Sequence, residues 1–115
     1  MSSSADNDPS ALAHGSWWVY LVRRADGALY TGIATDVERR FTEHCEGRGA
    51  KALRGRGPLE LAAYGAAGDR SRAQRIETRI KRLPKSKKEQ LARSPKRLDE
   101  FIHSFDGADA DLDAT

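Results

Sequence analysis

The sequence predicts a small α+β domain, with two strands in the first half of the chain and helices dominating the second half. Residues 17–24 and 28–34 are rich in aromatic and β-branched side chains and flank an Asp-Gly pair, a strong signal for a β-hairpin. After residue 70, apolar side chains recur at spacings of three and four, the period of an amphipathic helix. A chain of 115 residues has room for one domain of roughly 80 to 90 residues. We place this domain at 16–105.

The two ends of the chain differ from this central part in composition. We expect residues 1–15 to form a disordered N-terminal tail and residues 106–115 to form an acidic disordered tail. The start of the chain lacks the basic and apolar regions of a signal peptide, and no window approaches the ~20 apolar residues of a membrane-spanning helix. Cys45 is the single cysteine, so it cannot form an internal disulfide. We therefore expect a reducing, cytoplasmic setting.

The hairpin should lead directly into a helix over about 36–46. Thr35 and Glu38 have the spacing of a capping box, with Thr35 as N-cap, and the glycines that follow residue 46 end the helix. Arg40 and His44 are four residues apart and therefore lie on one helix face. The two tyrosines of the hairpin, Tyr20 and Tyr30, can share one face of the sheet if the register allows it.

A glycine-rich basic segment and a third strand come next. Residues 47–58 include four glycines, which suits a mobile loop along a phosphate backbone. The loop carries four basic residues: Arg48, Lys51, Arg54 and Arg56. Residues 59–66 show the short apolar alternation of a strand.

Three helices should complete the domain. The first begins at a second capping-box pattern, Ser71 to Gln74, and ends before Pro84, because proline disfavours the helical conformation of the preceding residue. A short basic helix follows over 85–93. The last helix starts at Ser94-Pro95, with serine as N-cap and proline in the first turn. The apolar stripes of the first and last helices are Ala73, Ile76, Ile80 and Leu83, and Leu98, Phe101, Ile102 and Phe105.

The charges are strongly polarised along the chain. The formal net charge is only +3, but all 20 Lys and Arg residues lie between residues 17 and 97, against nine acids. This central part would attract a polyanion, most commonly nucleic acid, because each neutralised phosphate releases condensed counterions. The alternative is a basic face that is simply solvated. The acidic C-terminal segment would solubilise the protein or compete with nucleic acid for the basic face.

The run WVYLVRRADGALYTGIATDVERRFTEH resembles the start of the GIY-YIG nuclease domain. The resemblance is to small standalone bacterial proteins whose first motif reads x-V-Y, related to the N-terminal nuclease domain of the excision-repair incision subunit. It spans about residues 17–93. Its most specific part is the ten-residue interval from Tyr20 to Tyr30, then Arg40 and His44 at eight and twelve residues after Gly32. The implied fold is a small three-stranded antiparallel sheet flanked by helices.

The resemblance also implies roles for the hairpin residues. Tyr20 matches the tyrosine near the attacking water and is the candidate general base. A free tyrosine has a pKa near 10, so this role needs a neighbouring cation or a metal-bound water, and otherwise Tyr20 only orients the water. Tyr30 would position the water or the scissile phosphate, and Gly32 permits close backbone approach. Trp18 stands where the name motif has glycine, and Arg24 where small relatives often have cysteine.

The remaining matched positions bring charge to the site. Arg40 would stabilise charge on the phosphorus, and His44 would contact the phosphate or relay a proton. Glu77 matches the acid that ligates a divalent cation, Mg²⁺ or Mn²⁺, with water and substrate oxygens as the other ligands. The implied reaction is one-metal phosphodiester hydrolysis that leaves 5′-phosphate and 3′-hydroxyl ends. Many family nucleases also have an asparagine after this glutamate, whereas here Ser86 and Gln90 are the neutral polar candidates.

Each matched residue has an ordinary structural alternative. The tyrosines could be packing residues of a half-buried hairpin. Arg40 could pair with Asp36 or Glu43 on its own helix. His44 could cap the helix end as a cation, and Glu77 could pair with Lys81 one turn later.

We expect a metal-dependent DNA endonuclease that acts on single-stranded or irregular DNA in repair or recombination. The alternative is a basic nucleic-acid-binding module with the same fold but without efficient cleavage, and a role on RNA is also open. The protein would be a monomer or weak dimer without a membrane partner. The expected nucleic-acid contacts are Arg48, Lys51, Arg54, Arg56, Lys81, Lys85, Lys87 and Lys88.

Overall fold

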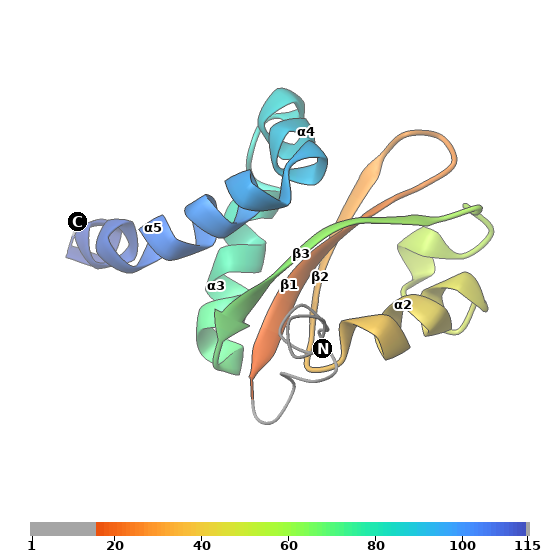
Figure 1. The fold of residues 1–115 in the computed structure, drawn as a ribbon, viewed down its shortest axis with the longest axis horizontal. Helices are drawn as coiled ribbons and strands as arrows, with labels where there is room; N and C mark the ends of the chain where they lie inside the picture. The colour runs from red at the N-terminus through yellow and green to blue at the C-terminus, as the bar shows by residue number, and fades with distance from the viewer. Residues whose placement is uncertain (1–15, 115) are drawn as a thin grey trace, which may run out of the picture.

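The computed structural model describes the backbone of residues 16–114 and the side chains of residues 16–105. In this part of the chain, three strands form one antiparallel sheet in the spatial order β2-β1-β3, with helices on both faces (Figure 1). The predicted α+β class and the three-stranded sheet are confirmed. The elements are β1 (Trp17–Arg23), β2 (Leu29–Ala34), α2 (Val37–Cys45), the 3₁₀ helix η1 (Lys51–Leu53), β3 (Glu60–Gly68), α3 (Arg70–Lys81), α4 (Lys85–Arg93) and α5 (Pro95–Ala114).

β1 is the central strand, and its side chains alternate between two buried faces. Trp18, Tyr20 and Val22 point to one face, while Val19 and Leu21 point to the other. All five side chains are at most 5% exposed. Because both faces of the strand are buried, its sequence is a continuous apolar run rather than an alternation of apolar and polar residues.

The turn between β1 and β2 confirms the Asp-Gly signal. The backbone N–H of Arg24 donates to the carbonyl of Ala28 at 2.9 Å, which closes a three-residue turn. Gly27 has φ of +90°, in the left-handed region that this type of turn requires at its last position. The resulting register places Tyr20 opposite Gly32 and Val22 opposite Tyr30.

The face that carries Val19 and Leu21 is covered by α3, α4 and α5 (Figure 1). Ile76 and Ile80 of α3 and Leu98 of α5 are fully buried there, as the predicted apolar stripes require. The helix α3 ends at Lys81, slightly earlier than the proline rule predicts. The core on this face is therefore mainly aliphatic, with Phe105 as its buried aromatic side chain, and is built largely from helices.

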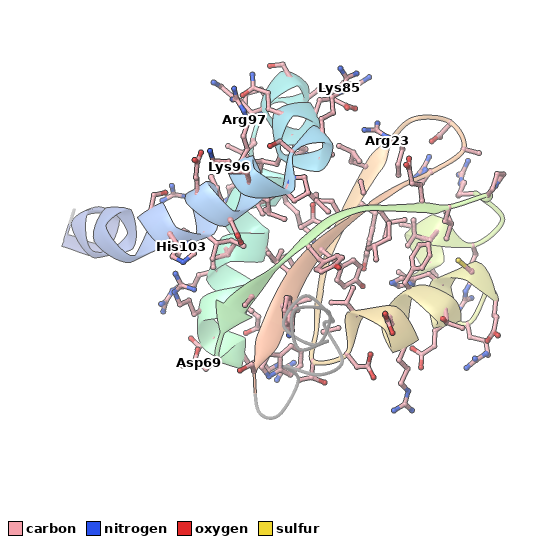
Figure 2. The ribbon with its side chains drawn as sticks, in the orientation of Figure 1. Arg23, Asp69, Lys85, Lys96, Arg97 and His103 are labelled. Carbon is pink, nitrogen blue, oxygen red and sulfur yellow. The ribbon has the colours of Figure 1, made fainter. Side chains whose placement is uncertain are left out.

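Arg23, at the end of β1, links the sheet to α4. Its Nη1 and Nη2 atoms donate to the two carboxylate oxygens of Glu89 at 2.8 and 2.9 Å. Figure 2 shows Arg23 at the end of the sheet nearest α4. This two-pronged geometry fixes direction as well as distance, so it helps to hold α4 against the strand.

The opposite face of the sheet is covered by α2 and the segment that contains η1. Val37 of α2 and Leu53 of η1 are at most 1% exposed and pack in the cluster that includes Tyr20 and Val22. The segment predicted as a mobile loop thus contains a short helix with a buried anchor. The side chain of Leu53 supplies the apolar contact that a glycine-rich basic composition does not suggest.

Two of the predicted helix caps are wrong, and the third is confirmed. Asp36, rather than Thr35, caps α2, because its Oδ1 accepts the backbone N–H of Arg39 at 3.1 Å. Asp69, rather than Ser71, caps α3 in the same way. In both cases a carboxylate close to the expected residue takes the cap position. Ser94 does cap α5, with its Oγ accepting a backbone N–H at 3.3 Å.

The ends of the domain remain predictions. The expected tail over 1–15 lies outside the described residues. At the other end, the backbone of α5 continues to Ala114, so the predicted boundary at residue 105 does not coincide with a helix end. Among the described helices, none combines the length and apolar composition needed to cross a membrane.

Candidate active site

Tyr20 and Tyr30 lie on the same face of the sheet, the face covered by α2. Their ring centroids are 6.4 Å apart. The ring of His44, from the last turn of α2, lies 5.9 Å from the ring of Tyr20 and 5.6 Å from that of Tyr30. Three of the five predicted catalytic residues therefore form one cluster, although they come from two strands and a helix.

Gly32 leaves the space in which the ring of Tyr20 lies. A Cβ atom at residue 32 would be 2.5 Å from Tyr20 Oη and 3.0 Å from a ring carbon of Tyr30. Real Cβ atoms essentially never come as close as 2.5 Å to another heavy atom, and the buried ring of Tyr20 has little room to move. The groups that come close to Gly32 in the structure are therefore the side chains of Tyr20 and Tyr30.

His44 is buried, and both of its ring nitrogens are engaged within the protein. Its Nε2 lies 2.8 Å from Tyr20 Oη, and its Nδ1 accepts the backbone N–H of Ala50 at 3.2 Å. The side chain is 2% exposed. In this arrangement both ring nitrogens already have partners within the protein. The expected contact between His44 and the phosphate stays a prediction.

Burial controls the ionisation of this pair. It raises the pKa of Tyr20, the charges of Tyr30 and Glu77 raise that pKa further, and the cationic Arg40 opposes them. Burial also lowers the pKa of His44, and the nearby charge of Arg40 adds to this shift. A neutral His44 does not fit the alternative role of a helix-capping cation.

Arg40 lies on α2, one turn before His44. Its Nη1 donates to Glu43 Oε1 at 2.9 Å, so the expected pairing on the helix surface is present. Its side chain is 39% exposed. The positive charge of the guanidinium lowers the pKa of both Tyr20 and His44. One side of the guanidinium remains open to solvent. Arg40 is thus placed between the buried pair and the outside.

Glu77 comes from α3, on the other side of the sheet. Its side chain is 20% exposed and forms an ion pair with Lys81 at 3.3 Å, as the structural alternative predicts. It is near enough for its charge to influence the pKa of Tyr20. Among the described residues, no group of three His, Cys, Asp or Glu side chains gathers into a metal cluster. A single accessible carboxylate with water as the other ligands fits Mg²⁺, which gives up its waters reluctantly.

The basic loop after α2 is fixed to the rest of the site. Besides the buried Leu53 and the contact of Ala50 with His44, the carbonyl of Arg56 accepts the N–H of Ala25 in the hairpin turn at 2.9 Å. The predicted contacts in this loop are exposed: Arg48, Lys51, Arg54 and Arg56. Arg48 pairs with Glu46. The loop therefore presents its charges from an anchored backbone.

The second group of predicted contacts lies around α4. Lys85 and Lys87 are exposed, and Lys88 is half-buried. Figure 2 shows Lys85, together with Lys96 and Arg97, around α4 and the start of α5, away from α2. The predicted basic residues thus form two groups, and the loop group adjoins the Tyr20 cluster through the contact of Ala50 with His44.

Two site residues were missed by sequence reasoning. In the sequence, Gly49 is one of the glycines that end the helix and belong to the basic loop, yet a Cβ atom there would lie 2.0 Å from His44 Nδ1. Ala50 gave no signal, because it acts through its backbone N–H. A contact of this kind depends on the path of the loop rather than on residue type.

Comparison with known proteins places the chain in a family. A family model described as the GIY-YIG catalytic domain matches residues 16–90. The chain therefore belongs to the GIY-YIG family, whose members are in general nucleases, and the predicted resemblance is confirmed.

Several similar proteins carry UPF0213 names. "UPF0213 protein YhbQ" of Salmonella arizonae is 53% identical over 89 residues, which is 77% of this chain and 89% of the relative. A "UPF0213 protein" of Citrobacter koseri is 60% identical over 75 residues, 65% of this chain and 75% of the relative. The solution NMR structure of the UPF0213 protein BH0048 from Bacillus halodurans has 46% identity, covering 66% of this chain and 81% of that chain, with a TM-score of 0.44. These names state no activity.

Proposed function

We propose that this protein is a metal-dependent endonuclease that hydrolyses phosphodiester bonds in DNA, with single-stranded or irregular DNA in repair or recombination as its substrate. The observation that carries the proposal is the Tyr20, Tyr30 and His44 cluster, with its rings within 6.4 Å of one another and the charges of Arg40 and Glu77 acting on it. Membership in the GIY-YIG family supports the reaction class.

Tyr20 is the residue that we assign to the attacking water. In the protein alone it is a neutral phenol at neutral pH, because burial raises the pKa of Tyr20. A neutral phenol orients water through hydrogen bonds, and it becomes a general base only when nearby positive charge stabilises the phenolate. The partly exposed Tyr30 would orient the water or the phosphate from the neighbouring strand.

Arg40 and Glu77 provide the charges of the proposed reaction. The guanidinium of Arg40 is open on one side, so it would donate to phosphate oxygens while Glu43 holds its other side. Glu77 would hold a divalent cation, Mg²⁺ or Mn²⁺, once its carboxylate leaves Lys81. Such a cation would polarise the phosphate and stabilise the leaving oxygen.

Nucleic acid would bind through salt-sensitive contacts with phosphates. We assign these contacts to the exposed Arg and Lys side chains of the anchored loop, which adjoin the site, and to a group of lysines on α3 and α4. The latter group is Lys81, Lys85, Lys87 and Lys88. We further propose that the protein acts in the cytoplasm as a monomer or weak dimer.

The test compares the wild type with Glu77→Gln on labelled single-stranded, duplex and branched DNA and on RNA, with magnesium, manganese or a chelator. We expect wild-type cleavage only with the metal, and no cleavage by Glu77→Gln despite nearly unchanged binding. Glu60→Gln is the matched control, because Glu60 is a largely exposed carboxylate that lies 3.8 Å from Arg23.

Equal cleavage by the wild type and Glu77→Gln would refute the assignment of the site. If the wild type binds nucleic acid but cuts none of the substrates, the protein is instead a binding module. Preferential cleavage of RNA would reassign the substrate while keeping the proposed site.

A further inference from the structure

The imidazole of His44 is held between a backbone donor and a phenol. The N–H of Ala50 points at Nδ1 with a nitrogen to nitrogen distance of 3.2 Å. A backbone N–H can only donate, so Nδ1 must present its lone pair. A neutral imidazole carries one ring proton, which must then be on Nε2. Nε2 lies 2.8 Å from Tyr20 Oη, so this proton is donated to the phenol oxygen.

The surroundings keep the ring in this state. His44 is 2% exposed, and Arg40 places a positive charge nearby, so a second ring proton is disfavoured. The opposite tautomer is disfavoured as well, because its Nδ1–H would face the N–H of Ala50. A ring fixed in this way cannot exchange the roles of its two nitrogens.

We propose that His44 is a positioning residue that acts on Tyr20 only as a hydrogen-bond donor, never as the acceptor of its proton, and that Gly49 and Ala50 impose this role. This inference rests on the proposed nuclease function for its catalytic meaning. It replaces the proton relay that the family resemblance implied for His44.

The chemistry of Tyr20 changes accordingly. Because Nε2–H donates to Oη, the hydroxyl hydrogen of Tyr20 is turned away from His44. When the Tyr20 O–H bond breaks, the proton passes to solvent water, and the Nε2–H of His44 stabilises the phenolate that remains. The phenolate then takes a proton from the attacking water as the new P–O bond forms. The P–O bond to the 3′ oxygen breaks in the same step, and the leaving 3′ oxygen takes a proton from solvent water.

The source of this control is the basic loop itself. Only glycine fits at residue 49, because a Cβ atom there would be 2.0 Å from His44 Nδ1. Ala50 supplies the N–H one residue later. Exposed basic side chains lie on both sides of this pair, at Arg48 and Lys51. A phosphate backbone bound by the loop would therefore be connected to Tyr20 through one backbone N–H and one imidazole.

The direct test is the tautomer of His44, measured by two-dimensional NMR of the ¹⁵N-labelled full chain through the couplings of the ring nitrogens to the ring hydrogens. His44→Gln identifies its signals among the three histidines. We expect the Nε2–H form alone between about pH 6 and 8, where a free histidine titrates. The Nδ1–H form, a mixture of tautomers, or a charged ring in that range would overturn the proposal. This readout does not depend on any nuclease activity.

A matched pair of loop variants tests the role of Gly49. Gly49→Ala should displace the ring and abolish the single-tautomer signature, whereas Gly57→Ala should keep it, because a Cβ at residue 57 meets its nearest atom at an ordinary 3.6 Å. If the wild type cleaves DNA, Gly49→Ala should lower kcat roughly ten- to one-hundred-fold, the range for losing a hydrogen bond to a charged group. An unchanged signature in Gly49→Ala would contradict the proposal, and if this variant fails to fold, the wild-type spectrum still decides.

Discussion

The two faces of the sheet are buried to a similar degree but with different chemistry. On the face covered by α3, α4 and α5, β1 presents Val19 and Leu21 to mainly aliphatic side chains. On the face covered by α2 and η1, the same strand presents Tyr20, whose hydroxyl meets His44. The first face is packed mainly through shape complementarity, whereas the second also buries polar atoms. Among these, the hydroxyl of Tyr20 and both ring nitrogens of His44 have partners, while Nε1 of Trp18 has none among the described residues.

This difference shows how a small domain combines stability with reactivity. A buried phenol and imidazole are tolerated because Ala50, His44 and Tyr20 form one continuous chain of hydrogen bonds. The aliphatic face carries no such requirement and can supply the stability that the other face uses. The following variants separate the two contributions.

The largest effect on stability is expected from Leu21→Ala on the aliphatic face. Leu21 is 0% exposed, so the substitution should cost about 2–5 kcal/mol of unfolding free energy, measured by urea denaturation. The folded fraction should still cleave DNA normally. A large loss of activity per folded molecule would show that the two faces are not independent.

Tyr20→Phe on the polar face should cost less stability than Leu21→Ala but much more cleavage activity. It leaves the Nε2–H of His44 buried without a partner, which costs about 1–3 kcal/mol, while cleavage should fall by about 100-fold or more. Tyr64→Phe is the control, because Tyr64 is paired with Tyr20 across the neighbouring strands and also loses a hydroxyl. Equal loss of cleavage in both variants would remove the special role of Tyr20.

The helix caps allow the stability of the two faces to be compared through the same kind of substitution. Asp36→Ala and Asp69→Ala each remove a capping carboxylate, from α2 on one face and α3 on the other. Each should lower the unfolding free energy by about 0.5–2 kcal/mol, measured by thermal or urea unfolding, and Thr35→Ala should have little effect. A larger effect of Thr35→Ala than of Asp36→Ala would reverse our cap assignment.

The smallest effect should appear in the pH dependence of stability. The pKa of His44 is lowered in the folded protein, so below the ordinary histidine pKa near 6.5 the unfolded chain takes up a proton that the folded protein does not. Stability should therefore decline as pH falls below that value, by at most about 1.4 kcal/mol per pH unit, and level off below the folded pKa. His44→Gln should reduce this slope in denaturation curves, and an unchanged slope would mean that His44 is not the cause.

Local signals in the sequence predicted most of the fold. The hairpin follows from β-branched and aromatic runs around Asp26-Gly27, and Ser94-Pro95 marks the start of the last helix. The two cap errors arose because a carboxylate lies within two residues of each expected hydroxyl, and both groups can accept the same N–H. Propensity alone does not choose between such neighbours.

The site was only partly predictable for a different reason. Motif spacing singled out Tyr20 and His44, but their contact joins residues 24 positions apart and depends on how α2 packs on the sheet. The role of Ala50 could not be predicted, because a backbone N–H is present at almost every residue. The path of the loop decides which of these groups reaches a functional side chain.

The close fit around Tyr20 has a practical consequence. Gly32 lies directly against the phenol, and His44 meets its hydroxyl, so removing the ring would leave a hollow of the same shape. Enclosed apolar hollows in proteins take up small aromatic molecules. A Tyr20→Ala variant would therefore be a candidate for chemical rescue, in which phenol added to the solution occupies the vacated space and substituted phenols of different acidity tune the rate.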